Sequence, residues 1–323
     1  MAMGRDQLWL KPAIAITMAA VLCTVALKFI TGFPGRPSGM TSLVAALTVV
    51  VVTAFFRFLR YFYGLWRDGE AHPLAKIRAQ FRPALLTFTP VAAGVAILVT
   101  FLYSITFLKS MIPAVVPFWA DAAFAATDRA MFIDPLAIAL ALKPLLPAIG
   151  LFYGMWHVAH IGGILWVVHW REGDKARHIL SFMLTWSIGM ASAYAFASMG
   201  PLFTGIYDRS IAPDSVRIAA EFLLANYRAE GALIGGGISA FPSLHVGIAA
   251  WLAIVLWDRG WQKAGIIYFF GVFVCSVILG WHYAIDGIGG AAIAMVADRI
   301  ARAWLRRDRA DAVRAGQPAA ATR

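Results

Sequence analysis

Residues 238 to 249 read ISAFPSLHVGIA and place a proline, a serine and a histidine at the start of an apolar segment. Proline is favoured in the first turn of a helix, because the N–H group that it lacks would have no partner there. Pro242 therefore predicts that a helix begins here, with Ser239 or Phe241 near its cap. His245 then falls in the first turn of an apolar helix, where a titratable side chain needs a role.

The whole chain is apolar enough to belong in a bilayer. Of its 323 residues, 61% are hydrophobic and only 14% are charged, a balance that cannot cover the surface of a water-soluble fold. Apolar runs of roughly 20 residues, enough to cross a hydrocarbon core, recur along the sequence. We therefore predict an all-α fold, a polytopic membrane bundle of about eight transmembrane helices. The predicted spans are 12–30, 40–56, 84–108, 144–168, 179–199, 243–257, 264–281 and 283–300.

The basic residues indicate how the bundle is oriented. The chain has 28 Lys and Arg against 17 Asp and Glu, a net charge of +11. When the connections are assigned to alternating sides, the excess falls on the side of both termini, which the positive-inside rule makes cytoplasmic. We therefore expect an integral protein of a bacterial inner membrane, without a nucleic-acid partner. The basic segment 57–83 is either a topology signal alone or also a contact for anionic membrane lipids.

Three segments follow from this pattern. Residues 1–83 hold two N-terminal helices and the basic cytoplasmic loop, 84–300 hold the catalytic membrane bundle, and 301–323 form a basic cytoplasmic tail that we expect to be disordered. Two outer connections, 109–143 and 200–242, are longer than a turn, and long ordered loops often carry function. The first contains a stretch that we interpret as an amphipathic helix at the interface.

A second histidine lies where the chain returns to the face of His245. In GWHYAIDGIGG, residues 280–290, His282 closes one apolar run and Tyr283 opens the next. One descent and one return through the bilayer bring both histidines to the same face. On a helix, Asp286 would lie one turn from His282 and could orient its ring, leaving the other nitrogen as a nucleophile or base. His245 would then supply a proton.

At these residues the sequence resembles the type 2 phosphatidic acid phosphatase superfamily. The second motif of those membrane enzymes ends in Pro-Ser-Gly-His, and their third contains His-x-x-x-Asp. The likeness covers about 239–290. FPSLH followed by HYAID is closer still to the branch that contains inositol phosphorylceramide synthases, which move a phosphorylated headgroup between lipids. The resemblance implies a six-helix phosphatase-like core, here preceded by two N-terminal helices.

The resemblance also implies roles for the three polar residues. His282 would attack phosphorus and become a phosphohistidine, Asp286 would orient it, and His245 would protonate the leaving oxygen. Two features depart from the family pattern. Ser276 stands where the third motif usually has an arginine, and the first motif, a lysine followed after six residues by Arg-Pro, is not found. The source of positive charge for the phosphate is therefore open.

Several residues are candidates to hold the substrate. We expect the phosphate at the start of the helix after Pro242, through Ser243 and Leu244, with Arg209 as the first choice of cation. His157 and His160 share a helix face, for which packing between helices and a place in the substrate pocket are both open interpretations. The pocket candidates are therefore Tyr153, His157 and Lys143.

We therefore expect an enzyme of lipid metabolism that acts on a lipid phosphate ester or diphosphate at the outer face. Water as acceptor would give a phosphatase, and a lipid hydroxyl would give a phosphotransferase. We expect neither a metal nor another cofactor, because no acidic cluster with metal-ligand spacing appears on the outer side. The alternative is a transporter or lipid-binding membrane protein that uses the His and Asp cluster for proton coupling.

Overall fold

A computed structural model describes residues 9–35, 39–170, 174–231, 233 and 235–314. Every regular element in these residues is a helix, which confirms the all-α prediction. Four segments are long and apolar enough to cross a membrane: Leu10–Thr31, Leu47–Arg67, Val91–Val115 and Lys143–Val168. The chain is therefore an integral membrane protein, with four such spans among the described residues where we expected about eight.

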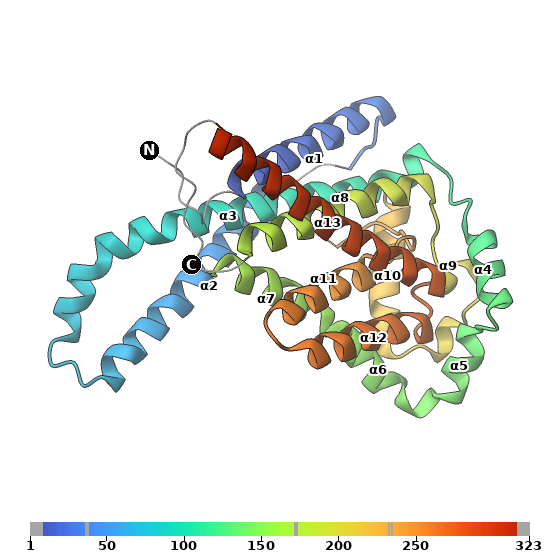
Figure 1. Ribbon diagram of the computed structural model, residues 1–323. Helices are drawn as coiled ribbons and strands as arrows, with labels where there is room; N and C mark the ends of the chain where they lie inside the picture. The colour runs from blue at the N-terminus through green and yellow to red at the C-terminus, as the bar shows by residue number, and fades with distance from the viewer. Residues whose placement is uncertain (1–8, 36–38, 171–173, 232, 234, 315–323) are drawn as a thin grey trace.

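The first three helices form a unit at one side of the molecule. Helix α2 and the first part of α3 extend away from the other helices as a hairpin, while the rest of α3 packs against α1 and α8 (Figure 1). The basic segment 57–83, expected as a loop, is mostly helical, and only a short turn around Gly69 joins the two helices. The bounds are α1 Leu10–Thr31, α2 Gly39–Arg67 and α3 Pro73–Val115.

The two long outer connections contain short helices. The segment interpreted as amphipathic, in the first connection, is helical as α4, and the second connection contains α10, which packs on α6. The fourth predicted span is interrupted at Met155, where α6 ends and α7 begins. The bounds are α4 Asp121–Ala130, α5 Pro135–Ala141, η2 Lys143–Leu145, α6 Leu146–Gly154, α7 Trp156–Val168, α9 Pro201–Thr204, η3 Arg209–Ile211 and α10 Asp214–Arg228.

The remaining helices form the centre of the bundle. Helix α13 packs against both α8 and α11, and α11 also packs against α12 (Figure 1). Helix α13 continues to Arg314, so most of the tail expected to be disordered is helical, and the rest of it lies outside the described residues. The bounds are α8 Lys175–Ala195, α11 Leu244–Asp258, α12 Gln262–Ile278 and α13 Ala284–Arg314.

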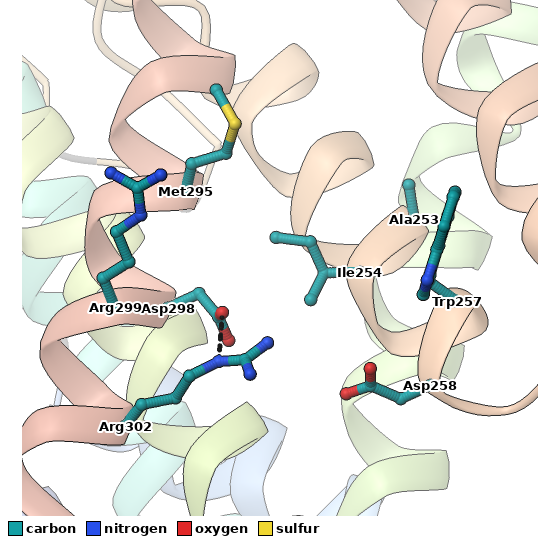
Figure 2. A pocket seen from close by; sticks show the side chains of 8 residues that line it. All are labelled: Ala253, Ile254, Trp257, Asp258, Met295, Asp298, Arg299 and Arg302. Atoms are coloured by element: carbon teal, nitrogen blue, oxygen red, sulfur yellow. Dashed lines mark hydrogen bonds and ion pairs between the residues drawn. The ribbon is translucent and has the colours of Figure 1, made fainter.

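Ion pairs join three of these helices at the end where α11 stops. The buried guanidinium of Arg177 on α8 donates Nε to Asp298 Oδ1 of α13 and Nη1 to Asp258 Oδ2 of α11, each at 2.6 Å. Buried charges are stable only when they are paired in this way. A hollow of about 470 Å³ opens between α11 and α13 beside this cluster, where Arg302 donates Nε to Asp298 at 2.8 Å (Figure 2).

Candidate active site

Helices α11 and α13 meet at their N-terminal ends. Ser243 is the N-cap of α11, where its Oγ accepts the N–H of Val246 at 3.3 Å, a usual role for serine. The N–H of Ser243 donates to the backbone oxygen of Asp286 in α13 at 2.9 Å. A Cβ on Gly290 would lie 2.2 Å from the Ser243 oxygen, so only glycine permits this approach. The cap is therefore Ser243, and Pro242 precedes the helix rather than opening it.

This junction brings the two predicted histidines together. The ring centroids of His245 and His282 are 6.0 Å apart. His245 lies in the first turn of α11, as expected, but His282 lies on the turn before α13, because that helix begins only at Ala284. The expectation that His282 and Asp286 share a regular helix is therefore wrong, although the fold still places them side by side.

Asp286 is fully buried next to His282. Its Oδ2 lies 3.5 Å from His282 Nδ1 and accepts the backbone N–H of Tyr283 at 2.8 Å. Its Oδ1 has no hydrogen-bond partner in the described part of the chain. The separation of 3.5 Å exceeds that of a strong hydrogen bond, but such contacts commonly shorten when substrate binds. A carboxylate at Nδ1 leaves Nε2 of His282 available for chemistry.

The ends of α6 and α7 enclose the His245 ring. Tyr153 stacks on it with centroids 5.1 Å apart, Trp156 lies at 4.1 Å, and His157 meets it edge-on at 5.9 Å. The indole N–H of Trp156 also donates to the backbone oxygen of His245 at 2.9 Å. Tyr153 and His157, named from the sequence as pocket candidates, are therefore next to His245. His160, one turn after Trp156 in α7, stacks on the Trp156 ring.

Two backbone N–H groups at the start of α11 are free to bind an anion. Leu244 and His245 donate no backbone hydrogen bond within the described residues, and such groups at a helix N-terminus favour a phosphate. The Leu244 side chain packs against Gly189 of α8. The N–H of Ser243 is already used to join α11 to α13, and its Oγ accepts from Val246, so Ser243 can offer a phosphate its hydroxyl proton alone.

The two cations named from the sequence lie on short exposed turns. Arg209 is exposed on the short turn η3, and Lys143 is exposed on η2 at the start of the interrupted span. Among the described residues, neither forms an ion pair. Nothing in their placement brings either side chain to His245 or His282.

Lys109 of α3 is a cation that our sequence analysis missed. Its side chain is half-buried near the C-terminal end of α3. Its backbone packs against Gly237, where a Cβ would lie 2.8 Å from the Lys109 carbonyl carbon. Lys109 has no ion-pair partner in the described residues. The available signal was an unpaired lysine one residue beyond a predicted span, on the same face as both histidines.

Comparison with known proteins adds a family to this geometry. The profile described as PAP2 superfamily matches residues 122–300, more than half of the chain. The chain belongs to the PAP2 superfamily. Comparisons with curated proteins and with solved structures gave no match.

Membership decides the general class of function. PAP2 proteins are generally phosphatases and phosphotransferases, and PAP2 phosphatases act on lipid phosphates in membranes, so this PAP2 chain is an enzyme of the membrane phosphatase type. The match runs from α4 to α13 and includes His245, His282 and Asp286. It leaves out α1 to α3, and therefore Lys109. The PAP2 match does not distinguish the inositol phosphorylceramide synthase branch from the rest of the superfamily.

Proposed function

We propose that this PAP2 protein removes or transfers the phosphoryl group of a lipid phosphate ester or diphosphate through a phosphohistidine on His282. The observation that carries the proposal is the meeting of two imidazoles and one buried carboxylate at the N-terminal ends of α11 and α13. Each of the three groups has a separate task in phosphoryl transfer.

In the first half-reaction, Nε2 of His282 forms a bond to phosphorus while the bond from phosphorus to the leaving oxygen breaks. His245, as imidazolium, gives its proton to that oxygen, which would otherwise leave as a costly alkoxide. Asp286 accepts the Nδ1 proton of His282 in a hydrogen bond and balances the positive charge that develops on the ring. The products are a phosphohistidine and a lipid alcohol or a lipid monophosphate.

In the second half-reaction, the acceptor gives its proton to His245, which is now neutral, and its oxygen attacks phosphorus. The bond between phosphorus and Nε2 breaks, and His282 returns to its starting state. Water as acceptor yields inorganic phosphate, and a lipid hydroxyl yields a new phospholipid. Both outcomes use the same residues, so the acceptor determines whether the protein is a phosphatase or a phosphotransferase.

The charge of the phosphate requires donors that are in place before the reaction. The free N–H groups of Leu244 and His245 can bind the phosphoryl oxygens at the start of α11. Lys109 can supply the positive charge that the missing arginine at Ser276 would otherwise provide. This set replaces Arg209 in our proposal, because Arg209 is exposed and does not contact the histidine pair.

We further propose that α8, α11, α12 and α13 also cross the bilayer, with both termini in the cytoplasm and the histidine pair at the outer face. Large apolar side chains are exposed on these helices, such as Ile267 of α12 at 70% and Ile288 of α13 at 50%. Such surfaces need lipid around them. A lipid phosphate can then reach His245 from the membrane without leaving its own leaflet.

The test compares wild type with His282→Ala and Asp286→Asn, each purified and incubated with ³²P-labelled lipid phosphates in the presence of a chelator. Substrates are offered with and without a lipid that carries a free hydroxyl. We expect an acid-labile phosphoenzyme in wild type, none in His282→Ala, and a large decrease in turnover for Asp286→Asn. His169→Ala is the matched control, because this histidine lies at the opposite end of α7.

The label also identifies the reaction. Radioactive inorganic phosphate indicates hydrolysis, and a labelled product lipid indicates transfer. Wild-type turnover by His282→Ala would refute the phosphohistidine mechanism, whatever the substrate.

A further inference from the structure

Helix α4 contains a buried carboxylate that caps a different helix. Asp128 is 2% exposed, and its two oxygens accept the backbone N–H of Ala284 at 3.0 and 3.1 Å. Ala284 is the first residue of α13, and the first N–H groups of a helix have no partner within it. Asp128 therefore supplies the N-terminal cap of α13, although the two residues are 156 positions apart in the sequence.

A second acid fastens the other end of α4. Asp121 lies seven residues before Asp128, two turns earlier on the same face of the helix. Its carboxylate accepts the N–H groups of Met199 and Gly200, at 2.9 to 3.0 Å, and the hydroxyl of Tyr283 at 3.1 Å. Both ends of α4 are thus attached to segments that surround the turn carrying His282.

The residues on either side of His282 are held by this arrangement. Gly200, with φ +97°, packs so closely that a Cβ would lie 2.5 Å from the Trp281 oxygen. Tyr283 is bonded to Asp121 through its hydroxyl, and Ala284 is bonded to Asp128. His282 itself lies before the regular helix, and its backbone N–H donates to the Ser276 oxygen at 3.3 Å. Its position depends on this bond and on these neighbours.

We propose that Asp128 is a positioning residue, which acts with Asp121 through α4 to hold His282 in line with the phosphate. This inference depends on the function proposed above, because it assumes that His282 is the nucleophile. The capping of α11 gives a comparison: there a local serine suffices. At α13 the chain buries a second carboxylate close to Asp286, which costs free energy. An exact position of the helix end would offset that cost.

The test measures kcat and KM separately for Asp128→Ala and Asp128→Asn, together with the rate of phosphoenzyme formation. A displacement of a reacting group by about 1 Å costs on the order of 100-fold in rate. We therefore expect Asp128→Ala to lower kcat and phosphoenzyme formation by about that factor while KM changes by less than about threefold. Asp128→Asn keeps one acceptor oxygen and should recover part of the loss.

Asp134→Ala is the matched control. Asp134 is another N-cap acid in the same connection, and it accepts the N–H of Ala137 at 3.0 Å at the start of α5. Its removal costs a helix cap of the same chemistry without touching α13, so its kcat should stay within about twofold of wild type. Equal losses in Asp128→Ala and Asp134→Ala would overturn the proposal, because a cap anywhere in the connection would then have the same effect.

The remaining outcomes separate the two proposals. Circular dichroism and gel filtration first establish that each variant is folded, and if Asp128→Ala is not, Asp128→Asn serves in its place. Wild-type kcat and phosphoenzyme formation in a folded Asp128 variant would overturn the positioning role and leave the proposed mechanism intact. Normal turnover by His282→Ala would instead remove the mechanism itself, together with the role of Asp128.

Discussion

His245 and His282 face each other across the N-terminal ends of α11 and α13, with ring centroids 6.0 Å apart and ring planes inclined by 54°. His245 belongs to the first turn of α11, and His282 belongs to the turn before α13. The proposed mechanism gives the two imidazoles separate tasks, attack by His282 and protonation by His245.

If His245 protonates the leaving oxygen, its loss should matter most for poor leaving groups. We expect His245→Ala to lower kcat for a lipid monophosphate by about 10²- to 10⁴-fold, the usual contribution of a general acid. The loss should be much smaller with p-nitrophenyl phosphate, whose leaving group needs no proton. Steady-state kinetics with both substrates provides the measurement. An equal loss with both would contradict the assigned role and point to a part in binding.

If Lys109 holds the phosphate, its charge should appear in substrate binding. A hydrogen bond to a charged group contributes about 1.5–3 kcal/mol, so Lys109→Gln should raise KM for a lipid phosphate by about 10- to 100-fold. Lys109→Arg should retain most of the affinity. Lys143→Gln, at an exposed lysine, is the control and should leave KM unchanged. An unchanged KM in Lys109→Gln would show that the cation is elsewhere.

The stability of the protein should depend on pH through Asp128. Burial, with a smaller contribution from Asp286, raises the pKa of this carboxyl from 3.8 to about 6, although its bond with Ala284 opposes the shift. The folded state therefore keeps a proton that the unfolded chain has already lost. This contribution to stability is present below pH 3.8 and disappears as the pH rises through 6, a change of about 3 kcal/mol.

The measurement is the melting temperature of wild type and Asp128→Asn in detergent between pH 4 and 7. Relative to the variant, wild type should lose stability over this range, since asparagine does not titrate. Asp134→Asn should follow the wild-type curve. A constant difference between wild type and Asp128→Asn would contradict the raised pKa.

Removal of the buried cation at the other end of the bundle should be costly. Arg177→Ala leaves Asp298, whose side chain is 9% exposed, without its main partner. Breaking a buried pair in this way typically costs about 3–5 kcal/mol. Arg217→Ala, which removes an exposed i,i+3 pair, should cost less than about 1 kcal/mol. Unfolding in detergent would compare them, and similar losses would show that the Arg177 network contributes little to stability.

The sequence predicted those parts of the site that follow from topology. His245 and His282 meet because two apolar runs descend and return, and the length of the runs alone gives that result. Asp286 is near His282 because four residues cannot separate them far, whether or not a helix joins them. The helical class of the fold follows equally from composition.

Contacts between segments that are distant in the chain could not be predicted in the same way. Asp128 caps α13 from a connection whose sequence indicates only an amphipathic helix. Lys109 packs against Gly237, and this contact also joins segments that are far apart in the sequence. The prediction that Pro242 opens the helix was wrong for a simpler reason. Proline and serine are both favoured where a helix starts, and only the hydrogen bond to Val246 identifies Ser243 as the cap.

The backbone bond from Ser243 to Asp286, and the absence of a side chain at Gly290, have a mechanical consequence. They hold the start of α11, which carries His245, against the start of α13, which follows His282. The two helix ends cannot move apart without separating the histidines. Tyr153 and Trp156, from α6 and α7, contact the His245 ring from outside this junction, so that side of the site is not held by the bond between α11 and α13.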